Sequence, residues 1–106
     1  MTEPGPGGDV SQGVMLDIGD GVGALVVHAT KALLGREVEV SPVVAGTPQR
    51  VHAVVHQRQA GGRPVFAAVF PSLAQGDYVL WDGERTLGQV TITGGQVTEA
   101  GWPGSG

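Results

Sequence analysis

Apolar and polar residues alternate along several short segments of the chain, a pattern that is typical of β-strands. Residues 65–70 (Val-Phe-Ala-Ala-Val-Phe) are apolar at both odd and even positions, which predicts a central strand covered on both faces. Pro71 has no backbone N–H to donate, so we expect this strand to end there. Residues 37–40 and 50–58 alternate more strictly and predict strands with one face in water.

Further apolar runs at residues 14–18, 24–29, 78–81, 90–93 and 97–99 also predict strands. Between them, Thr30 could cap a single helical turn that ends at Gly35. Turn residues separate the apolar runs every eight to twelve positions, roughly the spacing found in β-sandwiches. The pattern therefore predicts an all-β, Greek-key β-sandwich of about seven to eight short antiparallel strands.

The segment after Pro71 predicts a tyrosine corner. Leu73, Gly76 and Tyr78 occur at the spacing Leu-x-x-Gly-x-Tyr, directly before the apolar run that ends at Trp81. In such a corner the tyrosine hydroxyl bonds to the backbone a few residues upstream, where the chain crosses from one sheet to the other. This motif predicts the fold and carries no information on catalysis.

Residues 65–99 resemble the prealbumin-like β-sandwiches of the transthyretin and Cna-B type. The resemblance rests on the aromatic strand ending at Phe70, the corner at Tyr78, and a late Val-Thr-Ile-Thr strand (residues 90–93) before a glycine turn. The whole chain is also similar to a group of small uncharacterised bacterial proteins with GREVEVSP-like and AAVFPSLAQGDYVLW-like segments. These resemblances imply a fold.

They do not imply an activity, because the functional residues of the related families are missing. Cna-B-type domains often hold a Lys–Asn isopeptide bond, whereas this chain has no Asn and a single lysine, Lys31. Hydroxyisourate hydrolases of this fold end in a Tyr-Arg-Gly-Ser-like tail, whereas this chain ends in Trp-Pro-Gly-Ser-Gly. Their His and Arg motifs do not map onto His28, His52 or His56.

Composition narrows the classes of function further. The 106 residues suit one domain, with 6 Lys and Arg against 10 Asp and Glu and no basic stripe, so we expect no nucleic-acid binding. Cysteine is absent, which excludes disulfides and thiolate chemistry. No stretch approaches the roughly 20 apolar residues of a membrane span, and the N-terminal residues lack the features of a secretory signal. We therefore expect a cytoplasmic protein.

The chain divides into three predicted parts. Residues 1–12 are rich in Gly and Pro and are expected to be disordered. Residues 13–102 form the predicted sandwich domain, with Trp102 folding back onto it. Residues 103–106 are expected to be a flexible tail.

One glycine motif has two interpretations. Gly19-x-Gly21-x-x-Ala24 fits a relaxed dinucleotide-binding fingerprint, and Glu39 follows at about the distance of the ribose-binding acid. The same glycines also fit a hairpin turn, which suits the β-rich remainder of the chain better. The sequence does not settle whether residues 14–40 form a hairpin or a βαβ unit, and we expect no cofactor.

The histidines offer one candidate for metal or hydrolytic chemistry. His52 and His56 lie four positions apart on one predicted strand, hence about 13 Å apart, which is too far to share a metal ion. Each would need Glu37 or Glu39 from a neighbouring strand. The favoured interpretation is a solvated charged face, in which these glutamates pair with the basic strand. We therefore predict no catalytic residues and no metal site.

A second candidate is a contact surface. Trp81 and Val79 lie on one face of the strand 78–81, and Arg50 and Arg58 complete the predicted surface. For Trp81 itself, burial in the core is the favoured interpretation, because large aromatic side chains are usually buried. From these features we predict a small binding or assembly module that contacts a protein partner or a copy of itself. The alternative is a small hydrolase or metal-dependent enzyme that uses His52 or His56 with Glu37 or Glu39.

Overall fold

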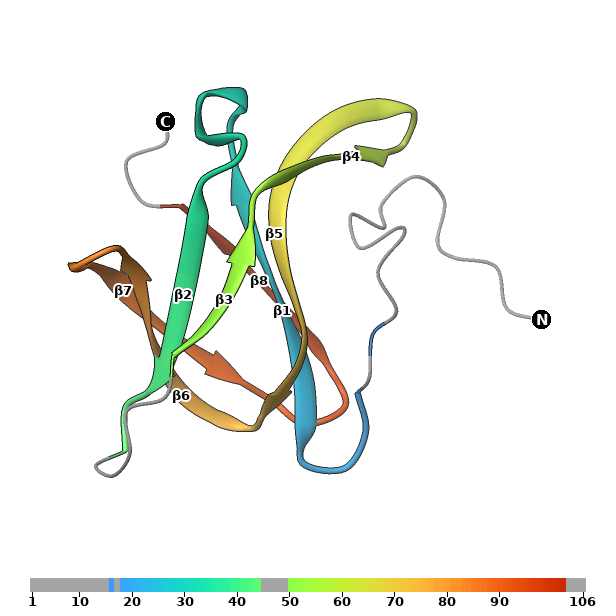
Figure 1. Cartoon of the computed structure of the whole chain (residues 1–106). Helices are drawn as coiled ribbons and strands as arrows, with labels where there is room; N and C mark the ends of the chain where they lie inside the picture. The colour runs from blue at the N-terminus through green and yellow to red at the C-terminus, as the bar shows by residue number, and fades with distance from the viewer. Residues whose placement is uncertain (1–15, 17, 45–49, 103–106) are drawn as a thin grey trace.

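Two four-stranded β-sheets pack face to face in the computed structural model, which describes residues 16, 18–44 and 50–102 (Figure 1). Sheet A has the strand order β4-β5-β1-β8, and sheet B has the order β3-β2-β6-β7. The elements are β1 (Val22–Ala29), the 3-10 turn η1 (Lys31–Leu33), β2 (Glu37–Pro42), β3 (Val51–Val54), β4 (His56–Ala60), β5 (Arg63–Ala74), β6 (Gly76–Asp82), β7 (Arg85–Ile92) and β8 (Val97–Gly101).

This architecture confirms the predicted all-β sandwich. The described residues form eight strands, and neighbouring strands run antiparallel except for β1 and β8, which are parallel. No helix among these residues has the length and apolar character needed to cross a membrane. The predicted N-terminal segment 1–12 and the tail 103–106 lie outside the described residues.

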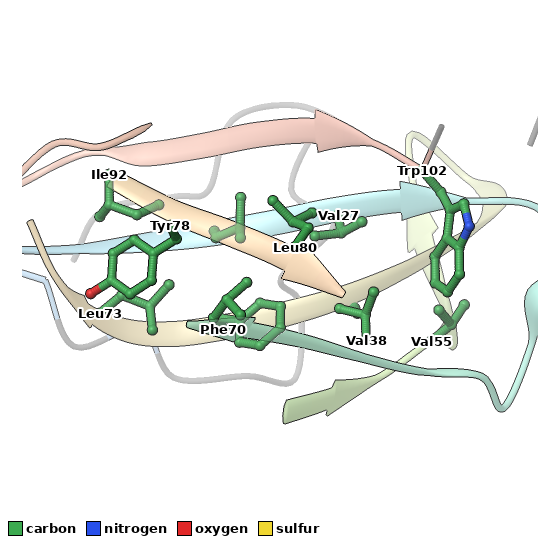
Figure 2. Close-up of a cluster of buried hydrophobic side chains, with 12 residues drawn as sticks. Val27, Val38, Val55, Phe70, Leu73, Tyr78, Leu80, Ile92 and Trp102 are labelled. Atoms are coloured by element: carbon green, nitrogen blue, oxygen red, sulfur yellow. The ribbon is translucent and has the colours of Figure 1, made fainter. Parts of the chain in front are cut away.

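The core lies between the sheets and collects the inward side chains of both. Figure 2 shows Phe70 at its centre, with Tyr78, Leu73 and Ile92 toward one end and Trp102 beside Val55 at the other. Burial of these side chains removes apolar surface from water, which is the main stabilising contribution to such a fold. The prediction that Trp102 folds back onto the domain is confirmed. Trp102 is 6% exposed, and its backbone N–H donates to the carbonyl oxygen of His28.

Strand β5 is covered on both faces, as its sequence predicts. Ala68 and Phe70 belong to the central core, while Ala67 and Val69 belong to a second cluster with Val26 on the outer face of sheet A. The expectation that β5 ends at Pro71 is wrong. The strand continues to Ala74, and the register with β1 shifts so that Pro71 and Ser72 together stand opposite one residue. A β-bulge of this kind accommodates a proline within a sheet.

The chain passes from sheet A to sheet B at the predicted tyrosine corner. The hydroxyl of Tyr78 donates to the carbonyl oxygen of Ala74 at 2.5 Å, four residues upstream. Ala74 ends β5 in sheet A and Gly76 begins β6 in sheet B, so the bond spans the crossing. The corner is therefore confirmed.

The segment predicted as one strand over residues 50–58 is divided between the two sheets. β3 pairs with β2 in sheet B, and β4 pairs with β5 in sheet A. Val55 lies between them, fully buried, and exchanges backbone hydrogen bonds with Gly35 and Arg36. These two bonds satisfy the backbone polar groups of Val55 where it leaves one sheet for the other, which burial would otherwise penalise.

The described residues before β2 contain no α-helix. Residues 22–29 form a strand, so the βαβ interpretation of the glycine motif is wrong for the described residues. Gly19 and Val22 instead exchange two backbone hydrogen bonds around a tight turn. The predicted helical turn is present as η1, but the side chain of Thr30 makes no capping hydrogen bond. The predicted strand 14–18 lies largely outside the described residues, and Leu16 and Ile18 are not in a strand.

Candidate functional site

The outer face of sheet B brings together most of the residues predicted for a binding or metal site. Strand register places Glu39 between His52 on β3 and Trp81 on β6, and places Ser41 beside Val79. Arg50, just before β3, reaches over the same face. We call this surface the Trp81 face and define it by Glu37, Glu39, Ser41, Arg50, His52, Val79 and Trp81.

Arg50 is held in place by three partners. Its guanidinium carbon lies 3.9 Å from the centroid of the Trp81 ring, a cation–π contact. The same side chain donates to Glu39 Oε1 at 2.9 Å and to the carbonyl oxygen of Gly83 at 2.8 Å. A half-exposed cation–π contact contributes about 0.5–1 kcal/mol, and an exposed ion pair about as much at most. Together these contacts fix the orientation of the guanidinium.

The indole of Trp81 is held in place by a hydrogen bond to the neighbouring strand β2. Its indole N–H donates to Ser41 Oγ at 2.9 Å, and Ser41 is only 6% exposed. The ring itself is half-buried, between the two sequence-based alternatives of core and open surface. Arg50 and Trp81 thus form a stacked pair in which Nη1 of Arg50 and the indole nitrogen of Trp81 are hydrogen-bonded. Side chains held in this way lose little freedom on contact with another molecule.

His56 and Arg58 do not belong to this face, contrary to the prediction that residues 50–58 form one strand. Both lie on β4 in sheet A, so His52 and His56 are on different sheets. Arg58 donates from Nε to the carbonyl oxygen of Ala67 at 3.0 Å, and burial lowers the pKa of its guanidinium. The predicted surface of four residues therefore reduces to Trp81, Val79 and Arg50.

The predicted charged face is present, with one ion pair of the expected kind. Glu39 bonds to Arg50, while His52 stands opposite Glu39 across the β2–β3 pair and is exposed. Among the residues that the structure describes, no three His, Asp or Glu side chains lie together as a metal site would require. The one pairing of histidine and glutamate that the enzyme alternative could use is His52 with Glu39, whose carboxylate already binds Arg50.

Sequence reasoning missed two partners in this face. The sequence pattern does not single out Ser41, although its place between Val40 and Pro42 puts it opposite the β6 strand. The Gly83 carbonyl comes from the tip of the β6–β7 hairpin, and only its position beside Arg50 reveals its role. Strand alternation indicates the first of these partners, and no local signal indicates the second.

Comparison of the chain with family models, curated proteins and solved structures gave no match.

Proposed function

We propose that the protein is a small binding module whose Trp81 face contacts another protein chain, either a partner or a second copy. The observation that carries this proposal is the stacking of Arg50 on Trp81 at 3.9 Å, with Arg50 fixed by Glu39 and Gly83. Tryptophan and arginine are the residues most enriched at the energetic centres of protein interfaces. In this protein the Arg50 and Trp81 side chains are held by contacts within the chain and remain partly exposed.

The surroundings of the pair suit a protein interface. Val79 adds apolar area beside Ser41, while His52 and Glu37 are exposed at the β3 side of the face. An apolar and aromatic centre bordered by polar groups is the usual anatomy of such an interface.

We also propose the prealbumin-like relationship, which rests on the corner at Tyr78 and the late strand at residues 90–93.

Photo-crosslinking in the protein's own cells tests this proposal. A benzoylphenylalanine residue is placed at Val79 in the full chain, and the adducts formed on irradiation are identified by mass spectrometry. We expect adducts with a second copy or with one defined protein, and we expect Trp81→Ala to abolish them.

The matched control carries the same photoreactive residue at Lys31, which is exposed on η1 and is not one of the residues of the Trp81 face. The same adducts from both positions, or none from position 79, would contradict the proposal. Native mass spectrometry of the untagged protein separates self-association from a distinct partner, because a copy adds the mass of one chain.

A further inference from the structure

A two-stranded ribbon extends beyond the body of sheet A. Strand β1 pairs with β5 only from Phe66 onward, whereas β4 pairs with β5 from Arg63 to Ala67. Residues 58–65 therefore form a hairpin without a third strand among the described residues, and it stands away from the rest of the sandwich in Figure 1. Gly61 and Gly62 close it with φ angles of 64° and 76°, as the twist of a two-residue hairpin requires.

One face of this ribbon is cationic. The register places Arg63 opposite Ala60 and Arg58 opposite Val65 within the ribbon, and His56 opposite Ala67 at its base, so the three basic residues share a face. The sequence contains no Asp or Glu between Glu39 and Asp77, although the chain as a whole carries a net charge of −4. The ribbon is thus a local basic site on an acidic protein.

The basic side chains are available to an anion. The ion pairs among the described residues join His28 to Glu99, Arg36 to Asp82 and Arg50 to Glu39, and none of them includes the ribbon. Arg58 is anchored through Nε to the carbonyl of Ala67. The terminal nitrogens of Arg58 can then bind a carboxylate. Because the Arg58 side chain is already ordered, binding costs less conformational entropy.

The backbone of β4 offers a second kind of contact. β4 is the outermost strand of sheet A in the described part of the chain, where no other strand pairs with its outer edge. Such an edge is a template for one more strand. Like charges disfavour the ribbon of a second copy at this edge, whereas an extended acidic segment matches both the edge and the basic face.

We propose that the β4–β5 ribbon binds an extended acidic segment of another protein by strand addition along β4. Side chains of a strand repeat on one face every second residue, so carboxylates at alternate positions of the segment would lie beside His56 and Arg58 on β4. Arg63 on β5 would approach the segment across the small side chain of Ala60. This surface is separate from the Trp81 face, and its test neither uses nor changes that face.

Fluorescence anisotropy of a labelled heptapeptide, alternating glutamate and valine, tests the proposal on the full-length protein. We expect saturable binding that weakens with salt and falls about tenfold in Arg58→Gln and in Arg63→Gln, since each loses one charge-assisted hydrogen bond. Arg63 is exposed, and its side chain takes part in no ion pair among the described residues, so its variant keeps the test valid if Arg58→Gln unfolds. Arg85→Gln, on β7 of the other sheet, is the matched control and should bind normally.

Two control peptides separate strand addition from simple charge attraction. A lysine–valine peptide should not bind. A glutamate–proline peptide keeps the charge but lacks alternate backbone donors, and it should bind at least tenfold more weakly. Equal binding of the glutamate–proline peptide, equal binding by all variants, or no binding of the glutamate–valine peptide would each overturn the proposal.

Discussion

The backbone of Gly23 packs directly against the carbonyl of Thr93, so that a Cβ atom on Gly23 would lie 2.4 Å from this oxygen. The same atom would lie 2.9 Å from the carbonyl oxygen of Gln96. Around this point Ala24 donates to Gln96 and Gly95 donates to Val22. The start of β1 and the turn between β7 and β8 are therefore joined backbone to backbone, with no room for a side chain.

Gly23→Ala should destabilise the protein by roughly 2–4 kcal/mol, because backbone atoms must move apart to admit the methyl group. Urea unfolding followed by circular dichroism measures the change. Gly101→Ala is the matched control, since a Cβ on that strand residue meets nothing within 4 Å. Equal stability of the two variants would contradict the close packing of Gly23.

Trp102→Ala should cost about 3–5 kcal/mol, the usual range for removing a large buried aromatic side chain. The indole closes the end of the core beside Val55 (Figure 2). Val97 is 43% exposed and lies on β8, the strand directly before Trp102. Val97→Ala should therefore lower the free energy of unfolding much less. Thermal unfolding of both variants gives the comparison, and a small effect of Trp102→Ala would show that the indole is not part of the core.

Tyr78→Phe should lower the free energy of unfolding by about 1–2 kcal/mol. The ring still fills the core, but the carbonyl of Ala74 loses the hydrogen bond across the corner. Urea unfolding measures the change. Unaltered stability would mean that water replaces the hydroxyl at no cost.

Alkaline pH should destabilise the wild-type protein through the same residue. Burial raises the pKa of Tyr78 above its usual value of 10.0. The unfolded chain therefore loses this proton at a lower pH than the folded one, and stability falls as pH rises above about 10. Tyr78→Phe should show a smaller loss over this range. Tyr78 is the only tyrosine in the chain, so its ultraviolet titration reports the pKa directly.

Local patterns predicted the parts of the fold that depend on neighbouring residues. The alternation at Glu37 and Glu39 gave the half-exposed strand β2, and the Leu-x-x-Gly-x-Tyr spacing gave the corner at Tyr78. Both are confirmed because the signal and the structure involve residues close in sequence. The break at Val55 was missed, since residues 50–58 alternate continuously and the change of sheet depends on bonds to Gly35 and Arg36.

The candidate site was also predicted only in part, because its residues come from strands that are far apart in the sequence. Sequence selected Trp81, Val79 and Arg50 for a contact surface, and it selected Glu39 for a charged face. Only the pairing of β2 with both β3 and β6 joined these into one cluster, with Arg50 bonded to Glu39 and stacked on Trp81. The sequence by itself determined most of the strand segments and their apolar faces, because a period of two follows from strand geometry, but it did not place the break at Val55 or the continuation of β5 past Pro71. Tertiary structure decided which strands are neighbours, because that choice depends on packing between residues far apart in the chain.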